Sequence, residues 1–495
     1  DPGAARWERG GRPMSVAPFF EKAGRPEQDR DRLMLISQHF PPNAAVGARR
    51  WEQFARFIAD RGWGLDVVMC RQAGDMDRAR MDALPDGVRV FDVPQPALMV
   101  ERLENWAARV YRILSPRDAP SGGPAFAGAS GAVPGPEWIT RDQLRWPPRT
   151  MREVTRVGSA YVVVARDEAW ARRAAAVGMQ VVRQGEHRAV VSSGPPHLAH
   201  EAARLVAAEA RLPLIVDMRD PWSLLPMLHE TYASPWWYRV ARRHERRVLA
   251  DAAVVIANTD HARNGLAAAY PEARTRMITV LNGTDSYPVP PSRKGGRFTI
   301  GFAGTVYLEQ DVRNLMRASA AVIRDLSLTP ADFGIDFIGD FGNPGELSID
   351  ALALEAGIPD YVSVGPRRAH ADALHFLAQA TMLVVFVGFG REFIPAKTFE
   401  YMRFDAWLLT LTDPGSATAE LLQGTDADLV GPADVAAIAA AIRKRYEMHC
   451  QGVAPVRVAR DDRFSRAKQA EILLDTIERV STQARRERSA LTIKS

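Results

Sequence analysis

The sequence predicts an α/β protein built from two doubly wound halves joined by a short linker. Short apolar runs rich in β-branched residues alternate with helix-like segments along most of the 495 residues. This alternation is interrupted near the middle by a Pro-, Gly- and Ser-rich stretch (286–296) with the composition of a linker. A chain of this length also exceeds a single hydrophobic core, so two large domains are expected.

The first half opens as a βαβ unit, which requires a parallel sheet with a right-handed crossover. A strand at 33–37 is followed by an amphipathic helix with Trp51 and Phe54 on its apolar face, and then by a strand at 65–70. Further strands are expected at 88–93, 189–193, 213–217, 253–257 and 277–281. A helix is predicted at 98–114, and the Ser-, Gly-, Pro- and Ala-rich residues 115–136 are predicted to form a mobile insertion.

The second half repeats the pattern. Strands are expected at 298–302, 334–339, 362–365, 381–387, 406–411 and 429–430, and a last long helix at 462–486. The predicted organisation is a disordered segment or extension (1–30), a first lobe (31–285), the linker, a second lobe (297–455), and a C-terminal helix and tail (456–495).

Composition restricts the class of protein. The net charge of +5 and the pI of about 9.3 suit anionic partners such as nucleotides, phosphates or an acidic membrane surface. Nucleic acid is disfavoured, because the arginines are dispersed and no nucleic-acid-binding module is recognised. The two cysteines, Cys70 and Cys450, indicate neither a disulfide framework nor a metal site. Without a membrane-spanning apolar run or a secretory signal, a cytoplasmic location is expected.

One stretch, 388–401, carries the clearest chemical signal. It follows the expected strand at 381–387 with a glycine loop and the start of a helix, and it contains Glu392, Lys397 and Glu400. A lysine in a first helical turn opposes the helix dipole at a cost of about 0.3–1 kcal/mol, whereas a phosphate bound there would make the same lysine favourable. A surface pair between Lys397 and Glu400 explains the lysine equally well.

The order of several motifs resembles that of retaining nucleotide-sugar glycosyltransferases with the GT-B fold, of the broad family-four type. Two glutamates separated by seven residues mark the donor site in that family, and Glu392 and Glu400 match this spacing. Residues 394–401 are similar to the family's Pro-x-Lys-x-x-Glu-Tyr variant. Other segments that resemble family motifs in the expected order are 37–47, 192–197, 217–222, 282–285 and 301–305. The resemblance implies two Rossmann-like lobes facing a central cleft, with the C-terminal helix crossing back to the first lobe.

The same resemblance implies roles for residues of the second lobe, which would bind a UDP- or GDP-linked sugar. Glu400 would accept hydrogen bonds from the ribose hydroxyls, and Glu392 would lie beside the donor sugar. Lys397, with Pro395 at the helix start, would bind the diphosphate and stabilise the departing nucleotide. The remaining donor-side candidates are Gly304 and Thr305 (phosphate), Val364 and Arg367 (base), and Arg313 (nearest match to the family's cationic residues).

Residues of the first lobe would form the acceptor side. His197 would hydrogen-bond the sugar or an acceptor oxygen, Arg219 and Asp220 would orient the acceptor or the contact between lobes, and Gly47 ends the loop after the first strand. The implied reaction retains the anomeric configuration, with His197, Lys397 and Glu392 as catalytic candidates, no metal and no cofactor. The expected product is a glycosylated cell-envelope polysaccharide, glycolipid or metabolite.

Two alternatives remain open at this point. A GT-B sugar-nucleotide epimerase would use the same donor without an acceptor, and a catalytically silent GT-B protein would act as a binding partner. A basic helix at 235–248 with aromatic residues at its start also leaves a peripheral position on an anionic membrane open, beside the simpler interpretation of a solvated arginine face.

Overall fold

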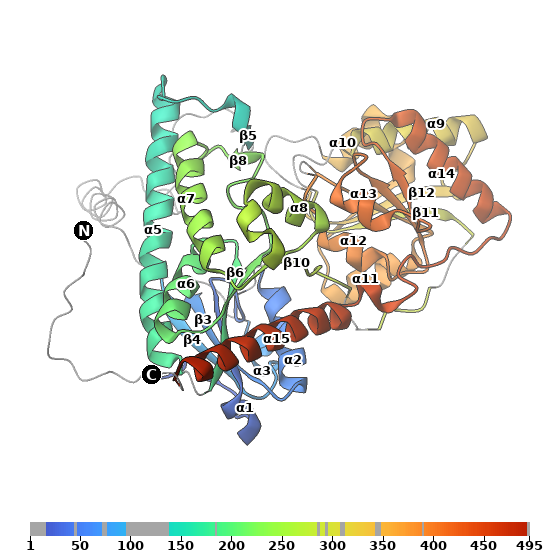
Figure 1. Ribbon diagram of the computed structural model, residues 1–495. Helices are drawn as coiled ribbons and strands as arrows, with labels where there is room; N and C mark the ends of the chain where they lie inside the picture. The colour runs from blue at the N-terminus through green and yellow to red at the C-terminus, as the bar shows by residue number, and fades with distance from the viewer. Residues whose placement is uncertain are drawn as a thin grey trace, which may run out of the picture.

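The computed structural model describes residues 16–43, 47–71, 77–95, 138–183, 186–284, 288–292, 296–306, 312–341, 348–388 and 391–492. The predicted helix at 98–114 and the predicted insertion at 115–136 lie outside these ranges. The described residues form two α/β lobes that lie side by side (Figure 1).

The first lobe is built on an eight-stranded sheet in the order β1-β4-β3-β2-β6-β7-β9-β10. Only β1 is antiparallel to its neighbour among these strands. The strands are β1 (Phe20–Glu21), β2 (Arg32–Ser37), β3 (Gly64–Arg71), β4 (Val88–Pro94), β6 (His187–Gly194), β7 (Leu214–Met218), β9 (Val254–Ala257) and β10 (Met277–Thr279). A separate antiparallel pair joins β5 (Trp138–Thr140) to β8 (Met227–His229).

Helices cover both faces of this sheet, as expected for parallel strands that are buried on both sides. They are α1 (Pro26–Arg30), α2 (Ala48–Asp60), α3 (Arg78–Asp82), α5 (Met151–Val181), α6 (Leu198–Ala210), α7 (Pro235–Asp251) and α8 (Asp260–Ala269), with short 3₁₀ turns at Arg141–Gln143 and Pro271–Arg276. One core cluster packs α5, α6 and α7 on the sheet, and another packs α2 on its opposite face.

The second lobe has a six-stranded, fully parallel sheet in the order β13-β12-β11-β14-β15-β16. Its strands are β11 (Phe298–Ala303), β12 (Phe333–Gly339), β13 (Val362–Pro366), β14 (Met382–Phe386), β15 (Trp407–Leu411) and β16 (Asp428–Val430). Its helices are α9 (Arg313–Leu326), α10 (Ile349–Glu355), α11 (His370–Gln379), α12 (Ala396–Tyr401), α13 (Ala417–Leu422) and α14 (Val435–Cys450), with 3₁₀ turns at Pro359–Tyr361 and Asp462–Phe464.

The last helix, α15 (Arg466–Thr492), returns to the first lobe (Figure 1). Ala470, Leu473, Leu474 and Ile477 belong to the core cluster that packs beneath the first sheet. The predicted crossing of the C-terminal helix is therefore confirmed. Every strand that the sequence predicts is present, with ends that differ by at most two residues.

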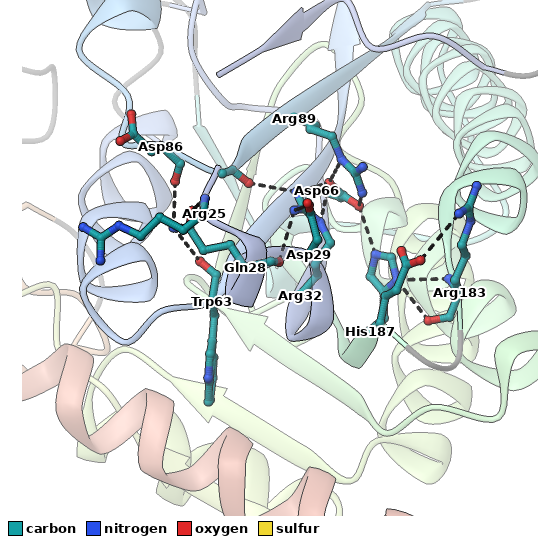
Figure 2. Close-up of polar contacts among 12 residues, drawn as sticks. Arg25, Gln28, Asp29, Arg32, Trp63, Asp66, Asp86, Arg89, Arg183 and His187 are labelled. Atoms are coloured by element: carbon teal, nitrogen blue, oxygen red, sulfur yellow. Dashed lines mark hydrogen bonds and ion pairs between the residues drawn. The ribbon is translucent and has the colours of Figure 1, made fainter. Parts of the chain in front are cut away.

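A buried ion-pair network holds four strands of the first lobe together (Figure 2). The Asp66 carboxylate on β3 is fully buried and accepts hydrogen bonds from Arg32 on β2 (2.6 Å) and Arg89 on β4 (2.6 Å). His187 donates to the same carboxylate through Nε2 at 3.0 Å, because an ionised carboxylate can only accept, and its Nδ1 lies against the backbone N–H and carbonyl of Arg183. Burial raises the pKa of Asp66, but the hydrogen bonds from Arg89 and His187 outweigh it and hold the pKa well below its usual range.

Two segments differ from the sequence-based prediction. Residues 16–30, expected to be a disordered segment or extension, contain β1 and α1, and Gln28 of α1 is buried under the first lobe. The 31-residue helix α5 was not predicted at all. Its apolar residues are spread around the helix instead of forming one stripe, so the usual periodicity is weak.

Candidate functional site

The predicted site residues lie at the points where each sheet reverses its strand order. In the first lobe the reversal lies between β2 and β6, and in the second between β11 and β14. Ligands of open α/β sheets bind at the carboxyl ends of the strands beside such a point. The predicted residues that follow these four strands are Gly47, His197, Gly304, Thr305, Glu392, Pro395 and Lys397.

Lys397 joins the two loops of the second-lobe switch point. Its ammonium donates to the Thr305 carbonyl at 2.8 Å and lies 4.3 Å from the centre of the Phe302 ring. A Cβ on Gly304, which has a φ of 127°, would stand 2.5 Å from Lys397 Cε, so only glycine leaves room for the lysine. Burial lowers the pKa of Lys397 to about 8, against the opposing effect of Glu400.

Glu400 lies about one turn further along α12, and its side chain is about a quarter exposed. Its Oε1 lies 2.9 Å from Nε2 of His370, the first residue of α11. Sequence reasoning missed His370. The available signal was its position just past β13, at the carboxyl edge of the second sheet.

Glu392 lies where the two lobes meet. Its carbonyl accepts a hydrogen bond from the Thr259 hydroxyl of the first lobe at 2.9 Å. The next residue, Phe393, is held from the other side, because its carbonyl accepts a hydrogen bond from Thr418 of α13 at 3.0 Å. Oε2 of Glu392 is buried and has no hydrogen-bond partner among the described residues. The loop backbone is thus fixed, while one buried carboxylate oxygen is left without a hydrogen bond.

His197 follows strand β6 at the switch point of the first lobe, and the residue is 8% exposed. Its ring stacks on Trp222 with a centroid distance of 5.1 Å, and its Nδ1 lies 3.4 Å from Nε2 of His200. Burial, together with the nearby His200 and Arg219, lowers the pKa of His197 well below its ordinary value. His197 is therefore a neutral imidazole at physiological pH, suited to hydrogen bonding and poorly suited to accept a proton.

Arg219 connects the loops after β2, β6 and β7. Its guanidinium donates to the Pro195 carbonyl, and a Cβ on Gly47 would stand 2.2 Å from its Nη1. Its Nε is buried without a hydrogen-bond partner in the described part of the chain. Burial raises the pKa of the neighbouring Asp220, against the opposing charge of Arg219. The structure thus brings together Gly47, Arg219 and Asp220, as the sequence predicts.

The buried carboxylate of Asp217, for which the sequence predicted no role, anchors residues next to these loops. Asp217 of β7 pairs with Arg50 of α2 at 3.1 Å and also accepts hydrogen bonds from Trp51 (2.7 Å) and Ser193 (3.0 Å). Arg50 donates in addition to the Asn282 side chain at 3.1 Å. Two of the segments that resemble family motifs, 217–222 and 282–285, are therefore joined through one arginine.

Three donor-side candidates are not among the described residues that contact Lys397. Arg313, at the start of α9, pairs with Glu355 of α10 at 3.4 Å. Val364 lies on the edge strand β13 and is 36% exposed, and Arg367 is exposed just after that strand. Their contact with a nucleotide stays a prediction.

A cavity of about 640 Å³ lies between the lobes. Its second-lobe wall is the loop that leads from β14 to α12, represented by Val387, Gly388 and 393–395. Its first-lobe wall includes His197 and Asp220. The predicted central cleft is thus present, and residues predicted for both of its sides line one cavity.

The described ranges contain no group of three or more His, Cys, Asp or Glu side chains placed to hold a metal ion. None of the helices that the structure describes is long and apolar enough to cross a bilayer. The basic helix predicted at 235–248 is α7, with Arg239, Arg242, Arg243, Arg246 and Arg247 exposed on its outer face and Trp236 and Trp237 partly buried.

Searches against models of protein families and against curated protein sequences found no match. Solved structures do match. HepE from Anabaena, solved in complex with UDP and glucose, superposes with a TM-score of 0.52 at 15% identity, over 90% of this chain and 99% of its own.

Two further solved structures give similar values. The α,α-trehalose 6-phosphate synthase from Burkholderia multivorans gives a TM-score of 0.54 at 12% identity, over 93% of this chain and 98% of its own. The lipopolysaccharide outer core galactosyltransferase WaaB gives 0.50 at 11%, over 90% of this chain and 99% of its own. The chain therefore has the GT-B fold of two Rossmann-like lobes, which glycosyltransferases of widely different sequence share.

Proposed function

We propose that the protein is a retaining glycosyltransferase that moves a sugar from a nucleotide-diphosphate sugar to a hydroxyl group of an acceptor. The fold supports this proposal, because structural neighbours include a galactosyltransferase and a protein solved with UDP and glucose. In the reaction, the bond between the sugar C1 and the diphosphate oxygen breaks and a bond from C1 to the acceptor oxygen forms. The acceptor oxygen attacks from the face that the diphosphate leaves, so the configuration is retained without an enzyme nucleophile. The acceptor's proton passes to the departing phosphate, so no enzyme base is needed.

The observation that carries the proposal is the placement of Lys397. It is a largely buried cation at a topological switch point, between a loop that requires glycine at 304 and a helix start. Its ammonium donates to the Thr305 carbonyl and forms no ion pair with a carboxylate of the described residues, although Glu400 is near enough to raise its pKa. A diphosphate at this position would gain a charge-assisted hydrogen bond and stabilisation of the negative charge that develops as the nucleotide leaves. In this position Lys397 would also supply the positive charge that a metal ion provides in other transferases.

The two glutamates would hold the rest of the donor. A carboxylate only accepts hydrogen bonds, which suits Glu400 to a ribose diol, and His370 would position that carboxylate. The unpartnered Oε2 of Glu392 would accept a hydrogen bond from a hydroxyl of the donor sugar. On the acceptor side, neutral His197 would hydrogen-bond a sugar or acceptor hydroxyl, and Asp220 would orient the acceptor.

A nucleotide-release assay tests the proposal. Purified protein is incubated with a panel of UDP- and GDP-sugars, and free nucleotide is measured with and without candidate alcohols. We expect one donor to be consumed, and Glu400→Ala to lower kcat/KM at least tenfold, because each hydrogen bond to a charged group contributes about 1.5–3 kcal/mol. Glu447→Ala, an exposed position on α14, is the matched control and should leave the rate unchanged.

Other outcomes of this assay separate the alternatives. Formation of an epimerised sugar from the donor, with no dependence on an alcohol, would replace the transferase with an epimerase. Equal rates for wild type and Glu400→Ala would contradict the donor-site assignment.

Donor affinity is expected to depend on pH through Lys397. The buried ammonium has a pKa of about 8 without ligand, and only its protonated form attracts the diphosphate. The dissociation constant should therefore be flat below pH 7.5 and rise toward tenfold per pH unit above pH 8. Calorimetric titration of the donor between pH 6.5 and 9.5 measures this. Lys397→Arg should abolish the rise, since a guanidinium remains charged throughout.

A further inference from the structure

The cavity between the lobes is lined almost entirely by apolar side chains on its first-lobe side. Three of the segments that contribute them lie away from the loops of the switch point. α5 contributes Val163 and Val164, α7 contributes Trp237 and Val240, and the segment around β8 contributes Leu225 and Leu228. At about 640 Å³ the cavity has the size of a small-molecule site.

The charged groups of the same wall have one sign. No lysine or arginine lines the cavity among the described residues, although the chain contains 64 of them. Its carboxylates are Asp167 of α5 and Asp220. Burial raises the pKa of Asp167 to about 6, against the opposing effects of Arg166 and Gln38, so this group is mostly ionised at pH 7. The nearby Arg219 does not line the cavity and donates to the Pro195 carbonyl.

These observations select among acceptors. Moving a phosphate into an apolar wall costs several kcal/mol unless a cation pairs with it. The wall offers the ionised carboxylate of Asp167 instead, which would repel the phosphate further. Burying apolar surface, by contrast, is favourable in proportion to its area, and an aromatic side chain buries about 150–250 Å². The carboxylates remain available as hydrogen-bond acceptors for hydroxyl groups.

We infer that the acceptor is an uncharged alcohol with an apolar body, such as an aryl or alkyl glycoside, and that sugar phosphates and lipid diphosphates are excluded from this cavity. The inference rests on the proposed function, because it treats the cavity as the acceptor side of the transferase. It adds the chemical class of the acceptor and names the α5 wall as its determinant.

Two probes and one pair of variants test it. Phenyl β-D-glucoside represents the uncharged aromatic class and glucose 6-phosphate the anionic class, and the dissociation constant of each is measured by calorimetry. We expect phenyl β-D-glucoside to bind at least tenfold more tightly than glucose 6-phosphate. Val163→Phe, which fills the cavity from α5, should weaken phenyl β-D-glucoside at least tenfold. Val162→Phe is the matched control on the same helix, because Val162 does not line the cavity.

Tighter binding of glucose 6-phosphate, or equal effects of the Val163→Phe and Val162→Phe variants, would overturn the inference. The affinity of the nucleotide-sugar donor, measured in parallel, should change less than twofold in both variants. This second readout also distinguishes the two claims. Absence of donor binding in the wild type would overturn the proposed function and, with it, the assignment of the cavity to an acceptor. Donor binding with a preference for glucose 6-phosphate would overturn the acceptor class alone.

Discussion

Replacing Lys397 with methionine is expected to lower kcat for sugar transfer by about 10²–10³-fold, the usual effect of removing one preorganised group that stabilises developing negative charge. Methionine has nearly the length of lysine and lacks the charge, so the space beside Gly304 and the Phe302 ring remains filled. The loss should appear in both kcat and KM, because Lys397 binds the diphosphate of the donor and stabilises it further as its negative charge grows while the bond to the sugar breaks. Steady-state rates of nucleotide release measure it.

The matched control is Lys444→Met, which makes the same change at an exposed lysine of α14 in the same lobe. Its rate should equal that of the wild type within a factor of two. A Lys397→Met protein that transfers sugar at a normal rate, with an unchanged circular dichroism spectrum, would remove the lysine from the reaction.

Replacing Asp66 with asparagine is expected to lower the free energy of unfolding of the first lobe by about 3–5 kcal/mol. The change leaves the buried guanidinium of Arg32 (1% exposed) without its closest carboxylate and also weakens the contacts from Arg89 and His187. The control is Asp29→Asn. Asp29 pairs with the same Arg32 at 3.2 Å but is 69% exposed, so a loss below about 1 kcal/mol is expected. The midpoint of urea unfolding measures both.

The pH dependence gives a second check on Asp66. Because its pKa is lowered in the folded state, its contribution to stability is complete above the unfolded value of about 4. It is then lost as the pH falls from 4 toward the lowered folded-state pKa. The difference between wild type and Asp66→Asn should therefore be constant from pH 5 to 7 and shrink below pH 4. A difference that grows in acid, or equal losses for Asp66→Asn and Asp29→Asn, would contradict the role given to this network.

Local sequence signals were sufficient to place the predicted strands of both sheets. Strands such as β2 and β14 are continuous apolar runs, because parallel strands covered on both faces bury every side chain. Their positions defined the loops in which Gly304 and Lys397 lie. Lys397, a lysine at a helix start, was the one local sign of an anion site. In the structure it lies at the switch point of the second lobe, between β11 and β14.

The remaining features depend on contacts between distant parts of the chain. Asp217 and Arg50 lie 167 positions apart, and no local pattern in the sequence pairs them. The contact between Glu400 and His370 joins the end of α12 to the start of α11, two helices whose proximity follows from the sheet order. Helix α5 escaped prediction because its apolar residues do not form one stripe, and with it the apolar cavity wall around Val163 was missed.

The central claim is that the switch point around Lys397 binds a nucleotide-diphosphate sugar, and the most direct measurement is a thermal-shift screen of UDP- and GDP-sugars on wild type and Lys397→Met. A donor present at 100 times its dissociation constant stabilises the folded protein by about 2.7 kcal/mol, which corresponds to a shift of several degrees. We predict that at least one nucleotide sugar raises the melting temperature of the wild type by this amount, and that the shift is lost or strongly reduced in Lys397→Met. No shift with any nucleotide sugar, or equal shifts in the two proteins, would contradict the account.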